Sequence, residues 1–294
     1  MKRLTALLAA MALLVTMAAP ASAITFGQPD GDRHPNVVNL LFVQDGVGYY
    51  SCSGTLLSPT LVLTAGHCTG VTVDGELQPN DVTYVTNETD INAFFAARRS
   101  LYPSLQAFLD AEWIAGEAIP HPDYSDFSEF PDTYDIGLVL LEEPIYVEVY
   151  GEMPSLGQFE YLRTAKGPPS QRRVEIVGYG LLGTIPSPNF YDVTTWARYY
   201  GYSTIINTGQ SANAGGQNFI YTNNPGKGNG VGGTCSGDSG GPAFWVDPQT
   251  GMTTNIIVGI NSYGIAPLCN GNDYQFRTDT AVAQDFVNYY LGGE

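Results

Sequence analysis

The sequence predicts an all-β protein, and three observations support this fold class. Short runs of branched and aromatic residues, bounded by turn-forming residues, recur along the 294-residue chain. Glycine (34 residues) and proline (19 residues) are abundant, whereas charged residues make up only 14% of the chain, a mixture typical of many strands joined by turns. The runs do not alternate with helical periods, which disfavours a parallel sheet built from β-α-β units. The length suffices for one large domain or two ordinary ones.

The predicted strands are set by these β-type runs. In chain order they cover residues 37–43, 55–65, 135–141, 173–180, 195–207, 219–223, 241–246 and 255–264.

One helix is predicted near the end of the chain. Four residues with helical spacing share one face: Val282, Phe286, Tyr289 and Tyr290. Asp279 or Thr280 can cap this helix and Gly292 can end it. Residues 91–118 are expected to include a shorter helix, broken near Pro103.

Residues 1–23 have the features of a signal peptide. Lys2 and Arg3 precede an apolar run, and residues 21–23 (Ala-Ser-Ala) have the small-x-small form of a cleavage site. A transmembrane anchor is the alternative, but the apolar run is shorter than the roughly 20 residues that a span requires. We therefore expect a secreted protein whose mature chain begins at Ile24, in an oxidising space that preserves disulfides.

Charge and composition exclude several functions. The 29 acidic residues outnumber the 12 Lys and Arg, a net charge of −17, which argues against nucleic acid or an anionic membrane as partner. No His-Glu-x-x-His motif or equivalent zinc-ligand spacing occurs. No cofactor or metal is predicted, although acidic side chains could bind a structural Ca²⁺. The four cysteines allow two disulfides.

Three short motifs carry the chemistry. Residues 64–68 read TAGHC at the end of an apolar strand, residues 134–141 read YDIGLVLL, and residues 233–242 read GTCSGDSGGP. They supply a histidine, an acidic residue that opens a buried strand, and a serine among glycines, in that order.

This combination fits nucleophilic catalysis. A serine hydroxyl needs a base to take its proton, and imidazole titrates near neutrality. A buried carboxylate behind the imidazole fixes its tautomer. We therefore predict Ser239 as nucleophile, His67 as base and Asp135 as the orienting carboxylate, with the N–H groups of Gly237 and Ser239 as the oxyanion hole.

Residues 237–241 (Gly-Asp-Ser-Gly-Gly) also fit the G-x-S-x-G motif of α/β-hydrolases. In those enzymes the catalytic histidine follows the serine. Here all three histidines, His34, His67 and His121, precede Ser239, so that alternative lacks a base.

These residues, in this order, resemble the secreted serine proteases of the trypsin/chymotrypsin family. The resemblance covers essentially the whole mature chain and implies two antiparallel six-stranded Greek-key β-barrels with a short C-terminal helix. Residues 24–150 would form the N-terminal barrel with His67 and Asp135, and residues 151–294 the C-terminal barrel with Ser239. Of the three possible disulfide connectivities, the resemblance implies Cys52–Cys68 and Cys235–Cys269.

The resemblance also implies an activation ion pair and a substrate pocket. The free amine of Ile24 would pair with the carboxylate of Asp238. The residues expected to bind substrate are Gly233, Thr234, Ser236, Ser262, Tyr263 and Gly264. Gly233 stands where trypsin-like enzymes carry an aspartate, so the predicted P1 residue (the one before the cleaved bond) is apolar or small rather than Arg or Lys. Tyr274 would border the far wall of this pocket.

The predicted function is therefore a secreted serine endopeptidase, monomeric, that hydrolyses polypeptide substrates through an acyl-enzyme. A catalytically silent binding protein on the same fold and an esterase are the alternatives. Residues 91–118 are an extra segment in the long gap between His67 and Asp135, either a lid or exosite or a plain surface insertion. Asn87 begins a glycosylation sequon that matters only in a eukaryotic secretory route.

Overall fold

The computed structural model describes residues 24–25, 27–44, 47–164, 166–181, 196–206, 211–223, 232–265, 269 and 271–292. The predicted signal peptide lies outside the described residues. Within them, no helix combines the length and apolar character needed to cross a membrane.

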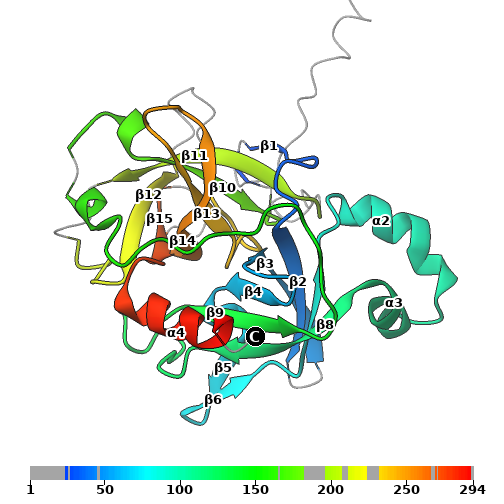
Figure 1. Ribbon diagram of the computed structural model, residues 1–294. Coiled ribbons are helices and arrows are strands. Elements are labelled where there is room, and N and C mark those ends of the chain that lie inside the picture. The colour runs from blue at the N-terminus through cyan, green and yellow to red at the C-terminus, as the bar shows by residue number, and fades with distance from the viewer. Residues whose placement is uncertain are drawn as a thin grey trace, which may run out of the picture.

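Two closed six-stranded antiparallel barrels form the fold (Figure 1), as the sequence resemblance implies. The first closes in the order β2-β3-β4-β9-β8-β7. Its strands are β2 (Val37–Gln44), β3 (Val47–Leu56), β4 (Leu61–Thr64), β7 (Val82–Thr86), β8 (Ile114–Pro120) and β9 (Gly137–Leu141). A small two-stranded sheet of β5 (Gly70–Val73) and β6 (Glu76–Pro79) stands beside it.

The second barrel runs in the order β11-β10-β13-β14-β15-β12 and is closed by pairing of β11 with β12. Its strands are β10 (Arg173–Gly178), β11 (Tyr199–Ile206), β12 (Asn218–Asn223), β13 (Pro242–Val246), β14 (Thr253–Gly264) and β15 (Gly271–Arg277). The short strand β1 (Gln28–Pro29) adds to its edge by pairing with β11.

The first and last segments of the described chain each pack against the barrel formed by the other half of the sequence. Ile24 is fully buried in the core of the second barrel. At the other end, α4 (Ala281–Leu291) lies over the first barrel, where the ring of Phe286 is 5.0 Å from that of His121. Thr280 caps this helix by accepting a hydrogen bond from the Ala283 N–H, and Gly292 ends it, as predicted.

The segment expected to hold a broken helix forms two. Helices α2 (Ile91–Arg98) and α3 (Leu105–Glu112) lie on either side of Pro103 and project from the first barrel (Figure 1). Phe108 anchors this hairpin because its ring is buried against Phe95 and Tyr102. The helices end before Trp113, and residues from Ile114 onward form β8, which pairs with both β7 and β9.

The strands β1, β5, β6, β7, β8, β15 and most of β3 were not predicted, and polarity is one reason. The single strand predicted over residues 55–65 was wrong, because residues 57–60 form a turn between the end of β3 and β4. Strand β15 reads Gly-Asn-Asp-Tyr-Gln-Phe-Arg, yet its last five residues are buried. Asp273 accepts hydrogen bonds from Thr234, and Gln275 donates one to Asn261 of β14. Only the tertiary structure supplies these partners.

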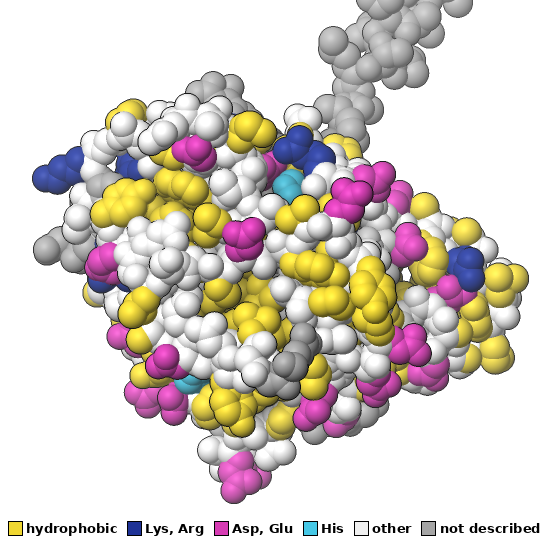
Figure 2. Space-filling model, in the orientation of Figure 1, with side chains coloured by type: hydrophobic (Ala, Val, Ile, Leu, Met, Phe, Trp, Pro, Cys, Tyr) yellow, Lys and Arg dark blue, Asp and Glu magenta, His cyan; other side chains and the backbone are white. Residues whose placement is uncertain are grey.

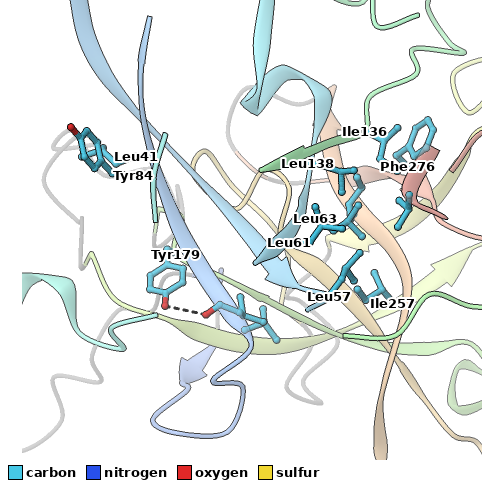
Figure 3. Close-up of a cluster of buried hydrophobic side chains, with 14 of the residues drawn as sticks. Leu41, Leu57, Leu61, Leu63, Tyr84, Ile136, Leu138, Tyr179, Ile257 and Phe276 are labelled. Atoms are coloured by element: carbon cyan, nitrogen blue, oxygen red, sulfur yellow. Dashed lines mark hydrogen bonds between the residues drawn. The ribbon is translucent and has the colours of Figure 1, made fainter. Parts of the chain in front are cut away.

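The two barrels share one hydrophobic core at their junction (Figure 3). Leu61, Leu63 and Leu138 of the first barrel pack in the same cluster as Ile257 and Phe276 of the second. This continuous packing fixes the barrels relative to each other.

Candidate active site

His67 lies in a short 3-10 helix, η1 (Gly66–Cys68), directly after β4. Gly66 is the first residue of this helix. A Cβ at this position would be 3.0 Å from the ring of Tyr124 and 3.2 Å from Oδ1 of Asp135. The absence of that Cβ therefore lets the tyrosine and the carboxylate approach the turn that carries His67.

Asp135 is fully buried just before β9 and holds the histidine at two points. Its Oδ1 accepts the backbone N–H of His67 at 2.8 Å, and its Oδ2 lies 2.9 Å from Nδ1 of His67. The Ser262 hydroxyl donates a further hydrogen bond to Oδ2. Three donors on one carboxylate set both the position and the ring orientation of the imidazole.

The two partners shift each other's pKa. Burial alone raises the pKa of Asp135, but the charge and hydrogen bonds of His67, with the bond from Ser262, outweigh burial and lower it. For His67, burial lowers the pKa, and the charge and hydrogen bond of Asp135, aided by the charge of Asp126, raise it above its usual value. Asp135 therefore remains an anion that stabilises the imidazolium.

Both predicted disulfides form. Cys52 on β3 joins Cys68, the residue after His67, and Cys235 joins Cys269. The first ties the histidine turn to a barrel strand. Closing loops of 16 and 34 residues stabilises the fold by about 3–4 kcal/mol each on a chain-entropy argument.

The loop that carries Ser239 is pressed against the first barrel. The Ser239 carbonyl accepts the Ser53 N–H at 2.8 Å. A Cβ on Gly240, whose φ is +76°, would lie 2.0 Å from the Thr64 hydroxyl and 2.8 Å from the Ala65 nitrogen. Only glycine allows this approach, and it brings the serine loop against the residues that lead into His67.

No hydrogen bond joins the Ser239 hydroxyl to His67 in the described part of the chain. In free enzymes this bond is often long and shortens only when substrate is bound.

Two backbone N–H groups of this loop are available to a ligand. Within the described residues, neither Gly237 nor Ser239 donates its backbone N–H to another protein group. Gly237 has a φ of +95°, and a Cβ there would be 2.9 Å from the Cα of Gly180. The predicted oxyanion hole therefore has donors that the fold leaves unused.

Asp238 is buried between these two residues. Its carboxylate accepts the Gly180 N–H at 2.8 Å and the Cys235 N–H at 2.9 Å. Burial, aided by the charge of Asp273, raises the pKa of Asp238 well above its usual value, despite these two bonds. A cation at this carboxylate would offset the cost of burying its charge.

The N-terminal segment lies close to the Asp238 loop. Thr25 forms an antiparallel bridge with Gly233, with hydrogen bonds of 2.9 and 3.2 Å between their backbones. The methyl Cγ2 of Ile24 packs against the bare Cα atoms of Gly201 and Gly232, where a Cβ would lie 2.9 and 2.8 Å from it.

A cavity of about 250 Å³ opens beside Ser239. It is lined by five of the six predicted substrate-binding residues: Thr234, Ser236, Ser262, Tyr263 and Gly264. The sixth, Gly233, is paired with Thr25. Tyr274 is buried and stacks on Tyr263 at 4.6 Å, whereas its neighbour Asp273 lines the cavity.

The sequence model of the trypsin family matches residues 27–287. The chain belongs to the trypsin family. It is 26% identical over 220 residues to chymotrypsin-like elastase family member 1 of Macaca fascicularis, a match that covers 71% of this chain and 67% of that protein. The solved structure of HL collagenase shares the fold, with a TM-score of 0.57 at 17% identity, over 89% of this chain and 95% of that one.

In this trypsin-family chain an aromatic rim, not predicted from the sequence, borders the histidine. The ring of Phe127 lies 5.8 Å from that of His67 and 5.9 Å from that of Tyr263, and Phe130 lies 5.4 Å from Tyr263. Phe127 and its neighbour Asp126 both have positive φ, which turns the loop over the histidine. Such a conformation depends on tertiary contacts, so no pattern in the sequence indicates it.

One cluster of potential metal ligands in the described residues lies beside the candidate active site. It consists of Cys52, His67 and Cys68. Because the two cysteines are joined in a disulfide, they offer no thiolate to a metal.

Proposed function

We propose that the protein is a secreted serine endopeptidase, in which Ser239 attacks a peptide carbonyl and forms an acyl-enzyme. The observation that carries this proposal is the buried carboxylate of Asp135, which holds both the backbone and the side chain of His67. The bond at Nδ1 leaves Nε2 of the imidazole as the proton acceptor. Membership of the trypsin family supports the same chemistry.

Each remaining residue has a role in this proposal. His67 takes the proton of the Ser239 hydroxyl as the hydroxyl oxygen bonds to the carbonyl carbon, and later returns that proton to the leaving amine. The N–H groups of Gly237 and Ser239 stabilise the oxyanion. Water then hydrolyses the acyl-enzyme by the reverse sequence of proton transfers. The backbone of residues 262–264 pairs with an extended substrate by adding it as a strand.

Export and activation belong to the same proposal. Cleavage after Ala23 removes the signal peptide and creates an α-ammonium group at Ile24. The buried side chain of Ile24 and the Thr25–Gly233 bridge support insertion of this amine beside Asp238. The proposed mature protein is a monomer with its histidine and aspartate in residues 24–150 and its serine in residues 151–294.

Two residues near the cavity bear on the proposed P1 preference, one uncharged and one acidic. Gly233 contributes no charge, which favours an apolar or small side chain, as the sequence predicts. Asp273 adds a carboxylate to the same cavity, a feature that the sequence argument did not include.

A phosphonate that reacts irreversibly with activated serines tests the proposal. We expect stoichiometric labelling of Ser239 in the mature protein, none in Ser239→Ala, and at most slow labelling in His67→Ala. Ser170→Ala is the matched control, since Ser170 is an exposed serine of η4 (Pro169–Gln171) with no role in the proposed site. Absence of labelling in the folded protein would favour a silent binding protein.

A digest of a peptide library, beside a set of simple esters, separates an endopeptidase from an esterase. Cleavage within peptides supports the proposal, whereas turnover of esters alone supports the esterase.

A further inference from the structure

A groove of about 540 Å³ lies between α4 and the turn that follows β8. The turn contributes His121 and Asp123, and the helix contributes residues with helical spacing, among them Phe286 and Tyr289. The groove is larger than the cavity beside Ser239, and the two have no lining residue in common. It is therefore a separate feature of the surface, away from the candidate active site.

The floor and one rim of the groove are apolar. Phe286 is buried with its ring 5.0 Å from that of His121, and Val282 beside it is half-buried. At the rim, Tyr289 is 77% exposed and its ring lies 5.0 Å from that of Tyr290. Figure 2 shows apolar and acidic side chains together on the lower part of the face, where α4 runs in Figure 1. An exposed tyrosine beside an apolar floor is typical of surfaces that bind other polypeptides.

His121 supplies the groove with a hydrogen-bonding atom that the fold does not use. The residue is only 8% exposed, and its Nδ1 accepts the backbone N–H of Asp123 at 3.1 Å, so the ring proton is assigned to Nε2. Burial lowers the pKa of His121 despite the opposing charge of Asp123, which keeps the ring neutral near pH 7. Within the described residues, Nε2 has no hydrogen-bond partner. A buried donor of this kind favours a ligand with an acceptor, such as a main-chain carbonyl.

The charged groups around the groove are carboxylates. Asp285 lies on the exposed side of α4, and across the groove the carboxylate of Asp123 is 4.0 Å from Nδ1 of His121. No lysine or arginine is among the described lining residues. The net charge of −17 also disfavours an anionic partner. The groove is therefore complementary to a cation that is attached to an apolar group.

We infer that this groove binds a polypeptide segment that carries arginine or lysine beside an aromatic or large aliphatic side chain. The apolar side chain packs on Phe286, the cation pairs with Asp285, and a main-chain carbonyl accepts the Nε2–H of His121. Arginine fits best, because its planar group can stack on Tyr289 while it pairs with the carboxylate. The inference goes beyond the proposed function and does not depend on it, since no residue of the groove takes part in the proposed reaction.

An NMR titration with a synthetic peptide tests the inference. The probe is acetyl-Gly-Arg-Phe-Leu-Arg-Gly-amide, added to the Ser239→Ala protein so that the peptide is not cut. We expect saturable binding with a Kd below about 1 mM. We also expect the Nε2 resonance of His121, identified by its absence in His121→Gln, to shift as the peptide binds.

Two substitutions at exposed positions of the groove locate the binding site. Tyr289→Ala should raise the Kd roughly tenfold, as expected for an aromatic contact residue, and Asp285→Asn should raise it roughly threefold. A peptide with citrulline in place of both arginines keeps their shape without the charge, so Asp285→Asn should no longer change its Kd. Thermal unfolding verifies that both variants are folded.

Matched controls come from elsewhere on the surface. Tyr146 is 78% exposed and Asp32 is also exposed, and neither lines the groove. Tyr146→Ala and Asp32→Asn should therefore leave the Kd unchanged.

Three results would overturn the inference. One is the absence of saturable binding up to about 1 mM peptide. Another is binding that leaves the His121 resonance unshifted and is unaffected by Tyr289→Ala and Asp285→Asn, which would place the peptide at another site. The third is self-association of the protein that Tyr289→Ala abolishes, which would assign the groove to a second copy of the chain. Phosphonate labelling and peptide cleavage test the proposed function separately, so either proposal can fail while the other stands.

Discussion

Residues added before Ile24 should nearly abolish activity, because they remove the α-ammonium group proposed to pair with Asp238. Two proteins test this expectation. One begins at Ile24, released from a fusion partner by a protease that leaves no extra residue. The other keeps Ser22 and Ala23, so that an uncharged peptide nitrogen replaces the amine.

The magnitude follows from the burial of Asp238, which is 1% exposed and whose two described hydrogen bonds come from uncharged N–H groups. Leaving a buried charge without its partner costs about 3–5 kcal/mol. At about 1.4 kcal/mol per factor of ten, the competent conformation of the Ser239 loop should become about 140- to 3,700-fold rarer. The same loss should appear in kcat/KM.

The assay combines active-site titration with kcat/KM on one peptide, after mass spectrometry has verified each N-terminus. Asp238→Asn in both proteins is the control. Without the buried charge, the extended and mature proteins should differ much less. Equal kcat/KM of the extended and mature proteins with intact Asp238 would refute the reasoning.

The same pair predicts an alkaline limit. An α-amine titrates at about pH 8 when free, and a carboxylate partner raises its pKa. The ion pair is therefore complete below the free value and is lost as the pH rises through the raised one. We expect kcat/KM of the mature protein to fall on the alkaline side, with a matching loss of conformational stability of the Ser239 loop.

Two further predictions concern charges that the sequence did not single out. Asp126→Asn should lower the pKa of His67 and move the acid limb of kcat/KM to lower pH, because the charge of Asp126 helps to raise that pKa. A pH-rate profile measures the change, with Asp123→Asn in the same loop as the control. An unchanged acid limb would show that Asp126 does not act on His67. Arg198 is 1% exposed and donates to Asp30 at 2.7 Å and to several carbonyls, so Arg198→Met should destabilise the fold by about 3–5 kcal/mol in urea unfolding. Arg198, together with His34, lowers the pKa of Asp30. The stability that this pair contributes is therefore present above the unfolded-state pKa of Asp30 and is lost as the pH falls through the lowered folded-state pKa. A loss of under about 1 kcal/mol in Arg198→Met would contradict the argument.

The sequence predicted those parts of the molecule that short motifs encode. The barrel architecture and both disulfides followed from the family resemblance, and the structure bears them out. The helix after Thr280 followed from its spacing and its cap. His67 and Asp135 are brought together as predicted, while the catalytic roles remain proposals.

The features that the sequence did not predict depend on contacts between distant segments. Asp273 lies in a strand that looks polar and unremarkable until β15 is paired with β14. Arg198 is one arginine among several, and only the fold brings Asp30 to it across 168 positions. Asp126 acts on His67 through a loop whose positive φ values no local pattern indicates. In each case the role of the residue depends on contacts between segments that are distant in the sequence.

The crossed packing of the segments at Ile24 and α4 has a practical consequence. Ile24 is buried in the second barrel while α4 covers the first, so each half holds the other by a terminal arm. A single proteolytic nick in the connection between β9 and β10 would leave two fragments clasped together, with the reaction centre still assembled. Such a clipped form should remain active and migrate as one species in gel filtration, and the two fragments, made separately, would serve as a complementation pair.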